Sequence, residues 1–192
     1  MNALTHEHTK KGMKYWDNIR NYFYKQNLEG RLKSLNVKHD IVNLNDAKTI
    51  GIVYDSTNPE NDTVIANFAR QLHGQNKQVE ILGFVNDKKI DTKPGVTIFN
   101  KKNLSWTLAP EDERVNQFAE KHFDLLLGCF IGENLPLEFI TRISKARWRV
   151  GAYVEKKTDC FDMMVNVGEK SDISYLIQQT THFLNQIKYD SK

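Results

Sequence analysis

The sequence is poor in the residues and runs that mark special environments. Its only two cysteines, Cys129 and Cys160, form no CxxC pair, so a disulfide-stapled fold is not expected. No stretch approaches the roughly 20 apolar residues that a membrane-spanning helix needs, and the polar opening segment has no apolar core like that of a signal peptide. We therefore expect a cytoplasmic protein with free thiols and no membrane span.

Glycine and proline are also scarce, at 10 and 4 of 192 residues, which excludes collagen-like and low-complexity chains. Hydrophobic residues make up 40% and charged residues 27%, so the chain is not wholly disordered. A globule of this length buries roughly 70% of the surface that its unfolded chain exposes, enough for one well-formed core.

The net charge of +3 is unevenly distributed. Residues 1–46 hold eight basic side chains against five acidic ones, whereas the rest of the chain holds 19 of each. The whole positive excess therefore lies on an N-terminal extension.

This extension has the spacing of an amphipathic helix. Tyr15, Trp16, Ile19, Tyr22 and Phe23 recur at intervals of three and four residues and define one apolar stripe. Three later leucines, at 28, 32 and 35, fall on nearly the opposite side of a straight helix. The pattern predicts two helical pieces with a break near residues 27–30.

A basic helix that carries aromatic rings is typical of a surface that contacts RNA, a ribonucleoprotein such as the ribosome, or an anionic surface, since lysine and arginine neutralise phosphates while rings stack or insert. The alternative is that the aromatic rings pack on the protein's own sheet and the basic side chains are merely solvated. The candidate contact residues are Lys10, Lys11, Lys14, Trp16, Arg20, Lys25, Arg31 and Lys33.

From residue 49 onward, short apolar runs alternate with amphipathic stretches, which predicts a mostly parallel sheet covered on both faces. Strands are expected at residues 50–54, 79–85, 96–99, 123–128, 149–154 and 162–165. The chain is thus predicted to be a three-layer Rossmann-like α/β domain, residues 47–192, with five to six strands and a helical extension, residues 1–46.

Only seven residues, 155–161, separate the last two expected strands, whereas a helical crossover takes a dozen or more. The final strand is therefore expected to be antiparallel or non-adjacent. A repeated phrase, Phe-Asp followed by apolar residues at Phe123 and Phe161, favours instead two strands entered from the same edge.

Open α/β sheets bind ligands beyond the carboxyl ends of their strands, where the strand order reverses. This rule selects two loops, and the candidate ligand-binding residues in them are Tyr54, Asp55, Ser56, Asn58, Gly128, Cys129, Gly132, Glu133 and Asn134. Neither GxGxxG nor GxxxxGK[ST] is present, which disfavours a dinucleotide or P-loop site. No cofactor and no metal are expected.

Each candidate also has a structural interpretation. Cys129 is more simply explained as a buried core thiol than as a nucleophile. Asp124 stands at the start of a strand, opposite the expected ligand crevice, and is more simply explained as a capping residue. Asp55 and Glu133 form an acid–base pair if they face each other, but capping and solvation are the favoured explanation. Trp106 is either an exposed contact residue or part of edge-strand packing.

Several phrases resemble a family of small α/β proteins of Bacteroidota that has no assigned activity. They are the strand at residues 49–55, the strand that follows Asp124, the phrase ISKARWRVG at residues 143–151, and FDMM at residues 161–164. The resemblance covers nearly the whole chain and implies a fold, not a catalytic site.

A second, partial likeness is to the N-terminal domain of glycosyltransferases that build lipopolysaccharide cores. It rests on residues 124–151, which run from a strand that begins with Asp through a helix and an Ala-Arg phrase into an Arg-x-Gly strand. It implies shared architecture; those enzymes hold the nucleotide sugar in a second Rossmann-like domain.

The sequence therefore favours a non-enzymatic binding or interaction module that contacts its partner, RNA or a ribonucleoprotein in the first instance, through the basic extension. The alternative is a transferase-like enzyme that binds a phosphorylated ligand or nucleotide at the carboxyl ends of the strands. A third possibility is a homodimer in which the extensions swap between subunits.

Overall fold

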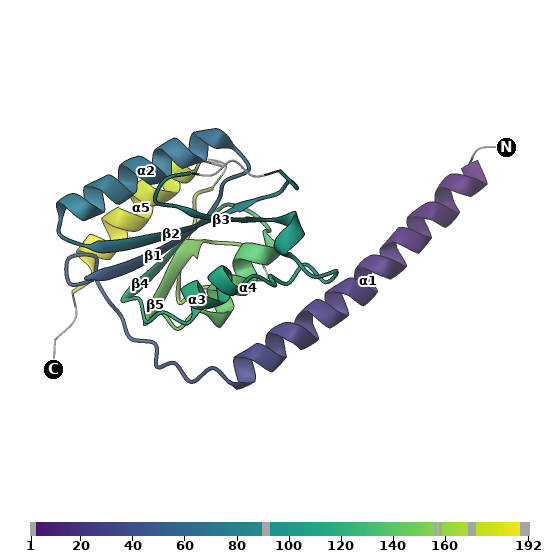
Figure 1. Ribbon diagram of the computed structural model, residues 1–192, viewed down its shortest axis with the longest axis horizontal. Helices are drawn as coiled ribbons and strands as arrows, with labels where there is room; N and C mark the ends of the chain where they lie inside the picture. Colours follow the sequence, from purple (N-terminus) through teal and green to yellow (C-terminus); the bar gives the residue numbers. More distant parts are fainter. Residues whose placement is uncertain (1–2, 90–92, 156, 158, 169–171, 189–192) are drawn as a thin grey trace.

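The computed structural model describes residues 3–89, 93–155, 157, 159–168 and 172–188, with side chains from Tyr15 onward. Within these residues the chain forms one six-stranded sheet in which every neighbouring pair is parallel (Figure 1). The strand order is β3-β2-β1-β4-β5-β6, so the chain extends the sheet outward from β1 first in one direction and then in the other. The strands are β1 (Thr49–Asp55), β2 (Gln78–Val85), β3 (Thr97–Asn100), β4 (Leu125–Cys129), β5 (Trp148–Ala152) and β6 (Met163–Val165).

Helices cover both faces of the sheet: α2 (Pro59–Gly74) and α5 (Ile173–Gln186) lie on one face, α3 (Glu113–Ala119) and α4 (Leu135–Ile143) on the other (Figure 1). Alternation along β1 sorts its side chains between the layers, because Ile50, Ile52 and Tyr54 join the α2 and α5 core while Val53 joins the α3 and α4 core. The predicted three-layer Rossmann-like α/β fold is confirmed.

Each of these four helices begins behind an Asp or Asn side chain that accepts a hydrogen bond from a backbone N–H of the first turn. The capping residues are Asn58, Asp112, Asn134 and Asp172. Pro59 and Pro136 follow two of them, where a missing N–H does no harm.

The N-terminal extension is one continuous helix, α1 (Ala3–Lys33), which packs outside α4 and projects past the body at its N-terminal end (Figure 1). The predicted break at residues 27–30 is wrong. Tyr24 and Leu28 are buried against Phe139 and Ile143, and the Tyr24 hydroxyl donates to the Leu135 carbonyl at 2.8 Å. No bend is needed, since the aromatic stripe on the other side of the helix remains in solvent.

The segment between α1 and β1 belongs to the body. Val42, Leu44 and Ala47 are buried in the same core as β1. The Lys77 ammonium donates to the carbonyls of Asn45 and Ala47, at 3.2 and 2.8 Å, which ties this segment to the turn before β2.

The connection from β5 to β6 corrects a second prediction. β6 pairs with β5 in parallel at the edge of the sheet, so it is neither antiparallel nor non-adjacent, and the alternative from the repeated Phe-Asp phrase, a strand entered from the same edge, is confirmed. The described residues between Tyr153 and Asp162 form no helix; instead Cys160 and Phe161 fill the α3 and α4 layer with their own side chains. Two buried side chains replace a crossover helix, which is why so few residues suffice.

Two arginines hold this connection in place. Arg142 of α4 donates to both carboxylate oxygens of Asp159, at 2.9 and 3.0 Å, and Arg149 of β5 does the same to Asp162, at 3.1 and 2.7 Å. The Arg142 guanidinium lowers the pKa of Asp159; burial alone would raise the pKa of Asp162, but the bonds from Arg149 hold it below its usual value.

We expect Gly151→Ala to destabilise the protein, because a Cβ at this position would lie 2.2 Å from the Phe161 ring. Overpacking of this kind typically lowers the free energy of unfolding by about 1–3 kcal/mol. Urea denaturation of the variant and of the unmodified chain measures this difference. The matched control is Gly30→Ala in α1, where nothing lies within 4 Å and a gain of roughly 0.5–1 kcal/mol is expected. Equal effects of the two substitutions would contradict the packing of Phe161.

Stability should decline in acid. The pKa of Asp159 and of Asp162 is lowered in the folded state, so the stabilisation from both carboxylates is complete above the unfolded pKa and is lost as pH falls through the folded pKa. Urea unfolding should therefore give a free energy of unfolding that is constant near about pH 6 and falls below about pH 4.

The Asp162→Asn variant tests this assignment. Its free energy of unfolding should be lower by about 1–3 kcal/mol at neutral pH and should fall less steeply in acid. An unchanged acid slope would show that this carboxylate is not ion-paired.

Candidate functional site

The strand order reverses between β1 and β4, and the loops after these two strands meet there. Asp55 ends β1, Asn134 caps α4, and the Asn134 amide donates to the Asp55 carboxylate at 3.4 Å. The second Asp55 oxygen accepts the backbone N–H of Thr57 at 2.9 Å. The structure thus brings together two of the predicted residues, one from each loop.

Glu133 does not face Asp55 as an acid–base partner. Its carboxylate is exposed and lies 3.4 Å from the ammonium of Lys157. The same ammonium donates to the buried carboxylate of Glu138 at 2.8 and 2.9 Å, and Glu138 also accepts the backbone N–H of Asn134 at 3.0 Å. Glu133 and Asn134 therefore diverge, one toward the β5–β6 connection and one toward β1.

Tyr54 and Ser56 belong to a closed polar network. Both hydroxyls donate to Asp62 of α2, at 2.8 and 2.6 Å, and the Lys93 ammonium binds the Ser56 hydroxyl and the other Asp62 oxygen. Burial would raise the pKa of Asp62, but Lys93 and the two hydroxyls lower it, so the carboxylate is a weak base. The Ser56 hydroxyl is thus bound by hydrogen bonds to Asp62 of α2 and Lys93 of the β2–β3 loop, and among the described residues no base activates it as a nucleophile.

The sequence reasoning missed two members of this network. Asp62 carried a usable signal, since an acid in the first turn of a helix is a common partner for nearby hydroxyls. Lys93 carried none, because a loop residue has no periodicity to place it. Asn58, a predicted ligand residue, is the cap of α2 and accepts the N–H of Glu60 at 3.1 Å.

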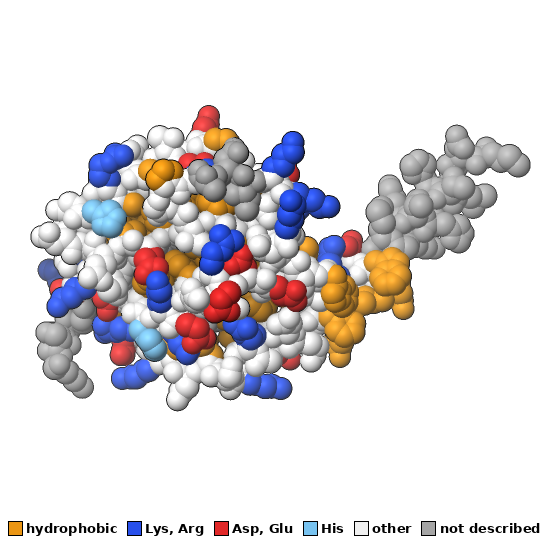
Figure 2. Space-filling model, in the orientation of Figure 1, with side chains coloured by type: hydrophobic (Ala, Val, Ile, Leu, Met, Phe, Trp, Pro, Cys, Tyr) orange, Lys and Arg blue, Asp and Glu red, His pale blue; other side chains and the backbone are white. Residues whose placement is uncertain are grey.

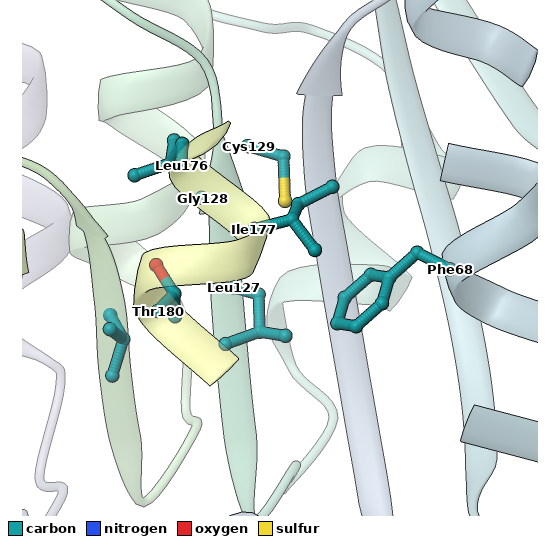
Figure 3. Close-up of a pocket in the computed structure, with 8 residues that line it drawn as sticks. Phe68, Leu127, Gly128, Cys129, Leu176, Ile177 and Thr180 are labelled. Carbon is teal, nitrogen blue, oxygen red and sulfur yellow. The ribbon is translucent and has the colours of Figure 1, made fainter. Parts of the chain in front are cut away.

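Gly128 and Cys129 lie in the core and not at the crevice. The Cys129 sulfur points into a small apolar cavity of about 10 Å³ beside Ile177 and Phe68 (Figure 3). The Phe161 ring covers Gly128, where a Cβ would lie 2.4 Å from it, so no phosphate can approach. Gly132 alone of the predicted glycines lies in an open turn, with a φ of 76° that favours glycine.

Four aromatic rings of α1 form an exposed apolar surface. Tyr15, Trp16, Tyr22 and Phe23 are exposed, and Trp106 of the body, 63% exposed, joins them through an edge-to-face contact with Phe23 at 5.3 Å. We call these five residues the aromatic face; in Figure 2 hydrophobic side chains gather in orange where α1 projects from the body. Solvent-exposed apolar patches of this kind mark interaction sites in soluble proteins.

Trp106 stands on a strained loop, residues 104–110. An antiparallel bridge between Leu104 and Pro110 closes the loop, and the N–H of Ser105 donates to the Ala109 carbonyl at 2.9 Å. Leu108 has a φ of 70°, a left-handed conformation that costs a non-glycine residue about 1–3 kcal/mol. On this loop Trp106 is exposed and contacts Phe23 of α1, and is not packed into an edge strand.

The predicted basic residues all lie on α1, and the described ones have different surroundings. Arg20 pairs with Asp17 at 2.9 Å, and Arg31 donates to Asn116 of α3 at 2.9 Å. Lys25 lines a groove of about 610 Å³ between α1 and α4, and Lys33 is exposed at the end of the helix. The side chains of Lys10, Lys11 and Lys14 lie outside the described part of the chain, although their backbone is helical.

A protein-family model described as a family of unknown function (DUF6913) matches residues 20–187. The chain belongs to the DUF6913 family. No curated protein and no solved structure matches it. In this DUF6913 protein the match includes Tyr22, Phe23 and Trp106 of the aromatic face, while Tyr15 and Trp16 precede it.

Two further findings concern the described residues of the DUF6913 protein. None of its helices there combines the length and apolar character that crossing a membrane requires. Nor do three or more His, Cys, Asp or Glu side chains gather there in a way that could hold a metal ion.

Both thiols should be unreactive in the folded protein. Burial raises the pKa of Cys129 and of Cys160 to about 12, and only the thiolate reacts. At about pH 8, iodoacetamide should label neither cysteine in the native state and both in urea, as counted by mass spectrometry. A single adduct on the native protein would place one of the thiols at the surface.

Proposed function

We propose that this protein is a non-catalytic binding module that holds single-stranded RNA on the aromatic face. The observation that carries the proposal is the exposure of five aromatic side chains from two distant parts of the chain on one surface. Aromatic rings that stand in solvent stack on unpaired bases, with roughly 1–3 kcal/mol for each base.

The charge of α1 supports a polyanionic partner. Its 31 residues hold seven basic and three acidic side chains, so the helix carries a net charge of +4 while residues 47–192 balance. Lysine and arginine on a helix that also carries stacking rings neutralise phosphates and release counterions when a nucleic acid binds. A second copy of α1 would be repelled by the same charge, which disfavours pairing of two arms.

The orientation of α1 supports the same conclusion. Tyr24 and Leu28 fix one side of the helix to the body, so the aromatic rings of α1 lie on the other side and are exposed, with Phe23 in contact with Trp106 of the body. A flexible strand can lie along this side without displacing any buried residue. The free thiols of Cys129 and Cys160 agree with the cytoplasm, where such RNA is met.

The test is fluorescence anisotropy of the full chain with a single-stranded RNA of about 12 nucleotides, a length within the usual site size. Replacing Trp16 and Tyr22 with alanine should weaken binding by about 5- to 150-fold for each ring that stacks on a base. The logarithm of the affinity should fall linearly with the logarithm of salt concentration, by about 0.7 for each phosphate contact.

Phe183→Ala is the matched control, since this ring is also exposed but lies on α5, outside the aromatic face. It should leave RNA affinity unchanged. Equal affinity of the Trp16 and Tyr22 variants and the unmodified chain would contradict the proposal. Binding of anionic lipid vesicles but not of RNA would replace it with a membrane-surface function.

A further inference from the structure

A cavity of about 410 Å³ lies beside the carboxyl ends of β2 and β3, where parallel α/β sheets take their ligands. Its walls come from the end of β2, from the short 3₁₀ helix η1 (Lys101–Asn103), from the Trp106 loop and from the start of α4. The volume lies within the roughly 300–1,000 Å³ that small-molecule sites occupy.

Two lysines line this cavity and leave the backbone at neighbouring points. Lys88 follows β2, Lys101 opens η1, and the Lys101 N–H donates to the Asp87 carbonyl at 3.2 Å. The Asp87 carboxylate accepts the backbone N–H groups of Lys88 and Lys89, so it is turned toward its own loop. Among the described residues, neither the Lys88 nor the Lys101 ammonium has a carboxylate within ion-pair distance.

The remaining lining divides into an apolar and a polar part. Phe84, Leu104 and Leu135 offer an apolar wall, while the side chains of Asn86 and Ser105 offer hydrogen-bonding groups. Glu133 carries the one carboxylate among the described lining residues, and it is already paired with Lys157. The cavity therefore presents two lysines that have no carboxylate within ion-pair distance in the described part of the chain, beside a surface that suits a flat aromatic group.

We infer that this cavity binds a small phosphate monoester with a flat aromatic group, of the class of nucleoside monophosphates. Two ammonium groups match the charge of a phosphate dianion, and the apolar wall matches the base. The strained Leu108 lies in the wall, so the loop that carries Trp106 is also the loop that would touch the ligand. Nucleotide binding here does not require RNA binding at the aromatic face, although the loop that carries Trp106 contributes to both sites.

The experiment titrates the full chain with AMP, GMP, CMP and UMP, and separately with inorganic phosphate and with adenosine, by isothermal calorimetry. At least one nucleotide should bind at least about tenfold more tightly than inorganic phosphate or adenosine, since each of these makes only part of the contacts. The double variant Lys88→Gln with Lys101→Gln should weaken this binding by about tenfold or more. Lys102→Gln, an exposed neighbour that does not line the cavity, should leave it unchanged.

Trp16→Ala should also leave nucleotide affinity unchanged, which separates this site from the RNA surface. The inference is overturned if no nucleotide binds at millimolar concentration, if inorganic phosphate binds as tightly as every nucleotide, or if the lysine variants bind as the unmodified chain does. Circular dichroism of each variant confirms that the exposed substitutions leave the fold intact.

Discussion

The packing of Tyr24 and Leu28 against α4 decides which side of α1 faces water. These two side chains, four residues apart, bury one side of the helix, and the Tyr24 hydroxyl satisfies the Leu135 carbonyl at the first turn of α4. Tyr22 and Phe23 directly precede Tyr24 in the sequence, but the helix turn places their rings on a different side of α1, where they remain exposed. The burial of Tyr24 and Leu28 therefore determines that the aromatic face is in solvent.

Much of the body follows from local pattern, and two features do not. An unbroken apolar run predicts β4, and an Asn-Pro pair predicts the start of α2. The predicted break in α1 is wrong because periodicity gives the angle between the aromatic and the leucine stripes but does not show that the leucine side is the one buried against the body. The expectation of an antiparallel or non-adjacent β6, drawn from the short connection, is wrong because connection length does not reveal that Phe161 fills the space of a helix, whereas the repeated Phe-Asp phrase indicated the observed direction.

The strand order alone predicts which loops meet at the crevice, but not which side chains point into it. Asp55 and Asn134 meet because strands at a switch point end at the same edge of the sheet. Cys129 belongs to the core because it continues the alternation of Leu125 and Leu127, all three in the layer of α2 and α5, a signal that was present in the sequence. The lysines of the 410 Å³ cavity were not predictable, since the β2–β3 loop and the turn after β3 have no period.

The most direct measurement is a ¹H–¹⁵N nuclear magnetic resonance titration of the full chain with single-stranded RNA. If the aromatic face is the contact surface, the largest shift changes will map to residues 15–23 and to the indole of Trp106, with Tyr24 and Leu28 retaining their contacts to α4. Changes confined to the carboxyl edge of the sheet, or an unperturbed α1 at saturating RNA, would contradict the account.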